Sequence, residues 1–176
     1  RDLPPEFGNW NSTFRRFRRW VQADVFKRIF DALSDEPDME YAMVDATIVK
    51  VHRCAIVAPL VQAQWRMNGR KRGTQSQAIG KSKGGWTTKV LALVDALGNL
   101  VRFVLMPANR YDTVGAAPLI HGVEFGAMLA DKAFDSNWII QDMNQRGAKI
   151  VISQRPQRLE PLLIDEEMYK WRHLIE

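Results

Sequence analysis

The chain has 176 residues, of which 46% are hydrophobic and 26% charged, as is usual for a globular protein with one principal core. It carries a formal net charge of +5 and one cysteine, Cys54, which excludes an internal disulfide and a paired-cysteine zinc site. No apolar run approaches the roughly 20 residues needed to cross a bilayer, and the start lacks the apolar centre of a signal peptide. We therefore expect a cytoplasmic protein with no membrane partner.

Basic residues gather in three places along the chain. The clusters are RRFRR at 15–19, RMNGRKR at 66–72 and GKSKGG at 80–85. Such clusters are typical of proteins that bind a polyanion, although any one of them is also explained as a solvated helix face or loop. The candidate DNA-contacting residues in these clusters are Arg15, Arg16, Arg18, Arg19, Arg70, Lys71, Arg72, Lys81 and Lys83.

The N-terminal region is predicted to be helical. Between residues 11 and 33, large apolar side chains recur at steps of three and four, which is the helical period. Ser12 is a candidate cap for a first helix and Asp24 for a second, so we predict a helical hairpin that ends at the turn-rich SDEPD of 34–38. The arginines of the first cluster lie between the apolar positions, and hence largely on the outward face.

The next segments predict strands. MEYAMVDATIVKVH at 39–52 is rich in β-branched and small apolar residues and predicts a buried strand with Asp45 at its centre. Residues 53–83 have no sustained period and predict a loop. The runs TTKVLALVD and LVRFVLM flank the turn-forming ALGN of 96–99, and together they predict an antiparallel hairpin.

Helices and strands alternate in the rest of the chain. Ser136 is the predicted cap of one helix and Gly147 its predicted end. The predicted elements are a helix at 113–121, a strand at 125–131, a helix at 136–147, a strand at 148–153 and a helix from near Pro161 to the terminus. The whole order predicts an α/β fold, in which a mixed sheet has helices on both faces.

We expect two parts in this chain. Residues 1–38 form a small helical segment that contacts DNA, and residues 39–176 form the domain that contains the sheet. The chain begins with Arg and stops at Glu176 inside a predicted helix. We therefore expect a fragment that is truncated at its C-terminus.

Two aspartates stand in unusual places. Asp45 lies inside an apolar strand, where an ionised carboxylate costs several kcal/mol unless it is paired or metal-bound. Asp131 closes a second apolar strand at its carboxyl end, where open α/β sheets usually carry their chemistry. Structural alternatives remain for both: a strand-end aspartate often caps the next turn, and a mid-strand aspartate can face a solvated edge.

The predicted terminal helix presents a third acidic residue. With 3.6 residues per turn, Tyr169, Arg172 and Glu176 share one stripe of this helix, beside an apolar stripe that faces the core. The simplest alternative explanation of that spacing is an exposed ion pair between Arg172 and Glu176, worth a few tenths of a kcal/mol.

These segments together resemble a known family. EYAMVDATIVKVH, SQAIGKSKGGWTTKVLALVDALGN, LADKAFD, YKWRHLIE and the N-terminal WNSTFRRFRRWVQADVFKRIFDAL are similar to bacterial insertion-sequence DDE transposases, of the family numbered five within the superfamily numbered four. The spacing Tyr-x-x-Arg-x-x-x-Glu, met by Tyr169, Arg172 and Glu176, is that superfamily's signature around its third acidic residue.

The resemblance implies a fold and an activity. Asp45, Asp131 and Glu176 would be the catalytic and metal-binding triad on an RNase H-like sheet, with two Mg²⁺ ions, for which Mn²⁺ can substitute. The enzyme would cut DNA at transposon ends and join the freed 3′-hydroxyl to target DNA. Its partners would be double-stranded DNA, namely terminal inverted repeats and target, and further copies of itself on that DNA, in the nucleoid of a bacterial cytoplasm. Arg172 would contact a phosphate near the cleaved bond, and Tyr169 would position Arg172 or the helix.

Other candidate features are weaker. Asp95, beside the ALGN turn, is a rival carboxylate that is better explained as a turn cap. His52 and Cys54 lack a second pair of metal ligands. Trp65 and Trp86 lie near basic loops and are candidates for base stacking, with core packing the better explanation for most of the six tryptophans.

Two other functions fit the same sequence. One is a non-catalytic DNA-binding or regulatory remnant of a transposase, in which the helical hairpin provides the contacts and the sheet is a scaffold. The other is an RNase H-like nuclease that cuts without rejoining. A strand-transfer assay separates them, because only a transposase produces joined DNA.

Overall fold

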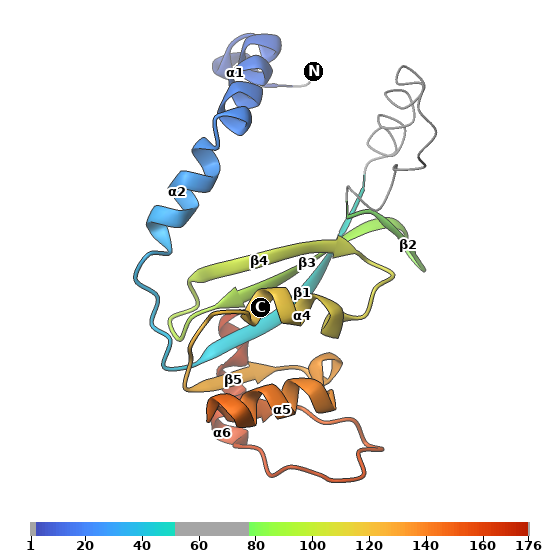
Figure 1. The fold of residues 1–176 in the computed structure, drawn as a ribbon. Helices are drawn as coiled ribbons and strands as arrows, with labels where there is room; N and C mark the ends of the chain where they lie inside the picture. Colours follow the sequence, from blue (N-terminus) through green and yellow to red (C-terminus); the bar gives the residue numbers. More distant parts are fainter. Residues whose placement is uncertain (1–2, 52–77, 176) are drawn as a thin grey trace, which may run out of the picture. The chain divides into compact units, whose positions relative to one another are not determined.

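The structure is a computed structural model, and it describes residues 3–51 and 78–175. The chain divides into two compact units, Arg1–Pro37 and Asp38–Glu176. Each unit is described by itself below (Figure 1). Among the described residues, no helix is long and apolar enough to cross a membrane.

The first unit contains short helices. They are η1 (Pro5–Phe7), α1 (Trp10–Gln22) and α2 (Val25–Leu33). The cap of α1 is Asn9, whose side chain accepts hydrogen bonds from the backbone N–H groups of Asn11 and Ser12, so the prediction that Ser12 caps this helix is wrong. Asn9 is the better cap because it precedes the first turn and reaches its unpaired N–H groups. Asp24 stands at the cap position of α2 with a left-handed φ of 51°, but its side chain makes no capping hydrogen bond.

Aromatic contacts join α1 to α2. The ring of Phe26 lies 5.6 Å from that of Phe17 and 5.9 Å from that of Trp20, measured between ring centroids. Within the described part of this unit, no residue of either helix is buried. The four arginines of the first basic cluster are exposed, as predicted.

The second unit is built on a six-stranded sheet of described residues. Its strands are β1 (Ala42–Lys50), β2 (Gly80–Ser82), β3 (Gly85–Val94), β4 (Leu100–Pro107), β5 (Ala127–Ala130) and β6 (Lys149–Ile152). Their order is β2-β3-β1-β5-β6, and β4 also pairs with β3. The pairs β1–β3, β2–β3 and β3–β4 are antiparallel, whereas β1–β5 and β5–β6 are parallel. The mixed sheet that the sequence predicted is thus confirmed.

The helices of this unit lie against the sheet. They are α4 (Asp112–Ile120), α5 (Asn137–Arg146), α6 (Glu166–Lys170) and the 3₁₀ segments η3 (Lys132–Phe134) and η4 (Trp171–Leu174). Gly147 ends α5 with a φ of +69°, as predicted. Ser136 stands at the predicted cap position of α5, but its hydroxyl makes no capping hydrogen bond.

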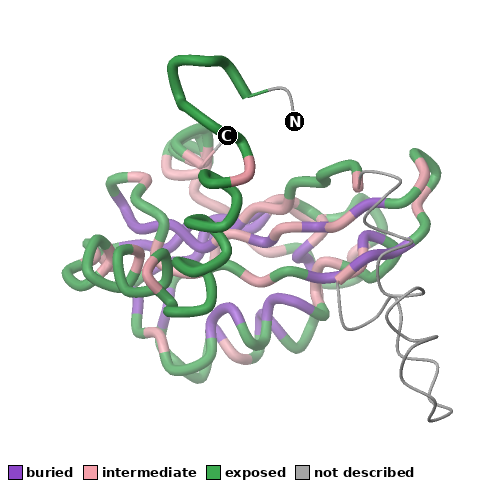
Figure 2. Tube along the Cα trace, turned by 90° about the horizontal axis from the view of Figure 1, so that it is seen from above, coloured by how far each residue is buried: buried purple, intermediate pink, exposed green. Residues whose placement is uncertain are grey.

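The buried residues of the described part of the chain form two clusters, whose strand members alternate between the two faces of the sheet. Figure 2 colours the buried residues purple. Side chains of a strand alternate between faces, so Val44 and Ala130 belong to the layer that also contains residues of α4 and α5. Met43 and Leu129 belong to the other layer, against which residues of α6 pack. We call these two sides the α4/α5 face and the α6 face.

The terminal helix differs from its prediction. It begins at Glu166 and not near Pro161, because Asp165 caps it by accepting a hydrogen bond of 3.0 Å from the N–H of Met168. Upstream, the side chain of Gln154 bonds both the N–H and the carbonyl of Leu162, which holds that stretch in a loop. The short strand β2 was not predicted, because its sequence, Gly-Lys-Ser, has low strand propensity. Of the predicted loop at 53–83, the structure describes only residues 78–83.

Candidate active site

Asp45 and Asp131 are neighbours in the sheet. Strands β1 and β5 run parallel, and Val44 pairs with Ala130, so the two aspartates occupy the next position along each chain. Adjacent strands lie about 4.8 Å apart. Asp45 comes two residues after Met43, and Asp131 comes two residues after Leu129. Because side chains of an extended chain alternate between faces, both aspartates lie on the α6 face. Remote positions in the sequence thus present two carboxylates side by side.

The backbone around Asp131 holds its carboxylate in place. The strand β5 ends at Ala130, and Asp131 caps the 3₁₀ turn η3 by accepting a hydrogen bond of 2.9 Å from the N–H of Ala133. The turn-capping alternative is therefore correct for this residue. This capping hydrogen bond does not prevent the Asp131 carboxylate from binding a ligand as well, because a carboxylate has two oxygens and about four lone-pair sites.

Arg172 forms an ion pair with Asp45. Its Nη1 lies 3.6 Å from Oδ1 of Asp45, and its guanidinium carbon lies 5.8 Å from the centre of the Tyr169 ring. The side chains of Arg172 and Asp45 are 22% and 29% exposed, so the pair is partly shielded from water but open to a ligand. One member of the predicted motif, Arg172, thus meets the first aspartate, and a second, Tyr169, lies beside Arg172.

Several contacts anchor the terminal segment to the α6 face. The rings of Tyr41 and Trp171 have centroids 5.2 Å apart, and the Tyr41 hydroxyl donates a 3.1 Å hydrogen bond to the carbonyl of Ala96. Met168, Tyr169 and Ile175 pack against the core layer of this face. Glu176, the predicted third acidic residue, lies outside the described residues, next to Ile175.

Asp95 is a structural carboxylate. It is buried at the end of β3 and accepts hydrogen bonds from the backbone N–H groups of Asp38, Leu97 and Asn99 and from the Asn99 side chain. Burial by itself would raise its pKa, but these four hydrogen bonds outweigh burial and hold the pKa of Asp95 below its ordinary value. The predicted turn-capping role of Asp95 is confirmed.

The donors at Asp45 and Asp131 suit a hard divalent cation. Mg²⁺ prefers carboxylate oxygens, and two such groups occupy neighbouring positions on one face. The guanidinium beside Asp45 shows that this carboxylate is placed to receive positive charge. Within residues 3–51 and 78–175, no group of three or more His, Cys, Asp or Glu side chains is arranged to hold a metal.

The basic clusters are described only in part. Arg15, Arg16, Arg18 and Arg19 are exposed on α1, and Lys81 and Lys83 are exposed at β2 and at the turn that follows it. The remaining cluster residues, Arg70, Lys71 and Arg72, lie outside the described residues, as do His52, Cys54 and Trp65.

The tryptophans contradict the core-packing explanation. All five that the structure describes are at least 39% exposed: Trp10, Trp20, Trp86, Trp138 and Trp171. The strand pattern contains the signal for Trp86, because alternate residues of β3 (Thr87, Lys89, Leu91 and Leu93) are buried and Trp86 falls on the other face.

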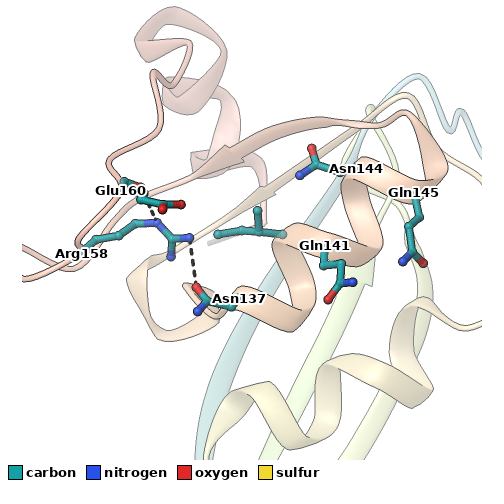
Figure 3. Close-up of a pocket in the computed structure, with 7 residues that line it drawn as sticks. Asn137, Gln141, Asn144, Gln145, Arg158 and Glu160 are labelled. Atoms are coloured by element: carbon teal, nitrogen blue, oxygen red, sulfur yellow. Dashed lines mark hydrogen bonds between the residues drawn. The ribbon is translucent and has the colours of Figure 1, made fainter.

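A surface pocket lies along α5 (Figure 3). Arg158 bridges its rim by donating hydrogen bonds of 3.1 Å to Asn137 and 3.0 Å to the carbonyl of Glu160. Its lining consists mainly of amide and charged side chains: Asn137, Ile140, Gln141, Asn144, Gln145, Arg158 and Glu160. Helix α5 packs on the α4/α5 face through Ile139 and Met143, so this pocket is not part of the carboxylate site.

Comparison with known sequences identifies the family. Residues 36–175 match the family described as "Transposase DDE domain", and the chain belongs to that family. A protein of Brucella ovis named "Putative transposase for insertion sequence element IS6501" is 34% identical over 92 residues, which cover 51% of this chain and 71% of that protein.

Two further similarities cover smaller parts of the other proteins. "Uncharacterized protein y4sN" of Sinorhizobium fredii is 38% identical over 55 residues, which are 31% of this chain and 44% of that protein. A piggyBac transposase, solved as a synaptic complex with hairpin DNA, is similar over 71% of this chain and 25% of its own, at 14% identity and a TM-score of 0.42. The chain thus spans less than half of the first of these proteins and a quarter of the second.

Proposed function

We propose that this chain contributes the catalytic site of an insertion-sequence transposase, which cleaves DNA at transposon ends and transfers the freed strand into target DNA. The observation that carries the proposal is that Asp45 and Asp131 directly follow the paired residues Val44 and Ala130 of neighbouring strands, with Arg172 of the terminal segment beside Asp45. Membership of the DDE family supports it.

Asp45 and Asp131, together with Glu176, would hold the divalent ions. When bound, Mg²⁺ or Mn²⁺ would polarise the phosphodiester and lower the pKa of the attacking hydroxyl or water. The third carboxylate is proposed for Glu176 because it follows Ile175, which packs on the same face as the two aspartates. An Asp45 carboxylate that already attracts a guanidinium is suited to bind a cation.

Arg172 would bind the phosphate next to the cleaved bond. A guanidinium offers a planar set of donors that matches phosphate oxygens, and it remains charged at any physiological pH. The Tyr169 ring, 5.8 Å away, would keep the guanidinium in position by a cation–π contact. As DNA and metal arrive, Arg172 would exchange its carboxylate partner for a phosphate.

The substrate would be double-stranded DNA carrying terminal inverted repeats, together with target DNA. The exposed arginines of α1 and Lys81 and Lys83 would bind its phosphates, as would Arg70, Lys71 and Arg72. Joining two transposon ends requires two sites, so we propose a homo-oligomer on DNA, acting in the bacterial nucleoid.

The test is a cleavage and strand-transfer assay. Duplexes from the ends of the element that carries the gene are incubated with the protein and Mg²⁺, and nicked and joined products are separated by size. Asp45→Asn and Asp131→Asn should each lower product formation by on the order of 10³-fold or more, while both variants stay folded. Asp142→Asn is the matched control, since Asp142 pairs with Arg146 on α5.

The outcomes separate the alternatives. Cleavage without joined products would indicate an RNase H-like nuclease. DNA binding that is indifferent to Mg²⁺, with no cleavage, would indicate a regulatory remnant. Wild-type activity in the Asp45→Asn variant would refute the assignment of the site.

A further inference from the structure

The α6 face continues past the carboxylates along β3. Ala92 pairs with Asp45 across the β1–β3 ladder, so both side chains lie on that face. Residues of β3 that differ from Ala92 by an even number share this face, which includes Trp86 at the far end of the strand. The indole and the carboxylates therefore belong to the same side of the sheet.

The strand end that bears Trp86 is built as a short two-stranded ribbon. We call residues 80–87 the β2–β3 ribbon, in which Gly80 pairs with Thr87 and Lys81 with Trp86. The Ser82 hydroxyl accepts a hydrogen bond from the N–H of Gly84 and another, of 3.0 Å, from the Thr87 hydroxyl. The turn is therefore held by internal hydrogen bonds.

Two glycines fix the position of this ribbon. Gly80 approaches the end of β4 so closely that a Cβ there would lie 2.9 Å from Cβ of Pro107 and 3.1 Å from the backbone N of Ala108. Gly85 has a φ of +105°, which other residues adopt only with strain. The ribbon thus lies close against the end of β4, with the geometry of its turn set by Gly85.

The ribbon displays positive charge beside an exposed aromatic ring. Lys81 lies opposite Trp86 on the same face, Lys83 is in the turn, and both lysines are exposed. The Trp86 side chain is 39% exposed. Lysine next to an exposed indole is the combination that binds single-stranded nucleic acid, because the lysine attracts phosphate and the indole stacks on a base.

The spacing along β3 relates this ribbon to the carboxylates. Trp86 lies six positions before Ala92 along β3, which corresponds to about 20 Å at roughly 3.4 Å per residue of strand.

We propose that the β2–β3 ribbon binds an unpaired DNA strand that leads away from the carboxylate site. Trp86 stacks on a base about 20 Å from the carboxylate site, at roughly 3.4 Å per residue of strand, and Lys81 and Lys83 contact the adjoining phosphates. The proposal rests on the proposed function, and it adds that the DNA is locally single-stranded on one side of the cut.

Fluorescence anisotropy with labelled DNA tests this proposal in the presence of EDTA, so that no cleavage occurs. The probes are a blunt duplex and the same duplex with a single-stranded extension of about eight nucleotides. Trp86→Ala should weaken binding to the extended duplex by about 5- to 100-fold, and change binding to the blunt duplex by less than about twofold. Trp86→Phe, which retains a ring, should keep most of the affinity.

Trp138→Ala is the matched control, since Trp138 is 40% exposed but belongs to α5 on the α4/α5 face. It should bind both probes as the wild type does, and circular dichroism melting checks that every variant is folded. Lys81→Gln should lower the slope of log affinity against log salt by about 0.7.

Two results would overturn the proposal. Equal changes in DNA affinity in Trp86→Ala and Trp138→Ala would show that the ribbon is not part of the DNA-binding surface. Equal losses on blunt and extended duplexes would show that the ribbon binds duplex DNA and not unpaired bases. Because these measurements require no metal, they are independent of the cleavage assay, in which Asp45→Asn tests the proposed function.

Discussion

Arg172 and Asp45 form an ion pair of 3.6 Å between the terminal segment and the centre of the sheet. The guanidinium brings positive charge to the carboxylate that the proposed function assigns to a metal ion. Guanidinium and metal would therefore compete for Asp45, and DNA phosphate would relieve the competition by binding Arg172. This relationship leads to the first prediction.

Arg172→Gln should bind Mn²⁺ more tightly than the wild type in the absence of DNA. A partly exposed ion pair is worth up to about 1 kcal/mol, so removing the competing charge should lower the Kd by about two- to fivefold. Electron paramagnetic resonance of free Mn²⁺ measures this directly. Lys170→Gln is the control, since Lys170 pairs with Glu167 on the same segment. An unchanged or weaker affinity in Arg172→Gln would contradict the competition.

Gly98→Ala should loosen the terminal segment. Gly98 has a φ of +85°, and a Cβ there would lie 3.2 Å from the carbonyl oxygen of Leu174. We expect a loss of about 1 kcal/mol from backbone strain and about 1 kcal/mol more from the contact. Gly122→Ala is the matched control, because its φ is +68° and its Cβ would meet open space. Urea unfolding should show the larger loss for Gly98→Ala, and equal losses would mean that the contact with Leu174 is unimportant.

Asp95→Asn should destabilise the second unit. The carboxylate accepts four hydrogen bonds. In the variant, the amide NH₂ group would face N–H groups that also donate, so those hydrogen bonds would be lost. The expected cost is about 2 kcal/mol near neutral pH, measured by urea unfolding. Because the folded-state pKa of Asp95 is lowered, its stabilisation is present above the unfolded pKa of about 3.9 and is lost as pH falls through the folded value. The difference in unfolding free energy between wild type and variant should therefore shrink in strong acid. A difference that does not change with pH would show that the stabilisation does not come from an ionised Asp95.

Lys89→Met should destabilise the packing of α4 on the sheet. The Lys89 side chain is only 9% exposed, and its ammonium binds the Asp112 carboxylate and, at 2.9 Å, the carbonyl of Arg110. Removing it leaves Asp112 without its buried partner, which should cost about 3 kcal/mol in thermal or urea unfolding. The double variant Lys89→Met, Asp112→Asn should recover part of that loss. A double variant that is less stable than Lys89→Met would contradict this explanation.

Local patterns in the sequence predicted much of this fold. The hairpin of β3 and β4 follows from two β-rich runs around ALGN, and helices α4 and α5 follow from their periodicity and from Gly147. The failures occurred where local signals were short or competed. Three residues of β2 are too few to show a strand pattern, and the capping of α6 by Asp165 overrides the helix start expected near Pro161.

The candidate site was predictable in kind but not in arrangement. Asp45 stood out because it lies inside an apolar strand, where a carboxylate is costly without a partner, and Asp131 because it closes an apolar strand at its carboxyl end. Their adjacency depends on the register of β1 with β5, which pairs Val44 with Ala130, and a slip by one residue would turn one aspartate to the opposite face. No local pattern sets that register.

By itself, the sequence determined which residues can do chemistry and which segments are strands or helices, because side-chain chemistry and backbone periodicity are local properties. The tertiary structure alone decided that Arg172 meets Asp45, that Asp95 is occupied by four hydrogen bonds, and that Trp86 is exposed on the face of the carboxylates. These relationships depend on strand register and on packing between segments that are far apart in the chain, where many weak contacts act together.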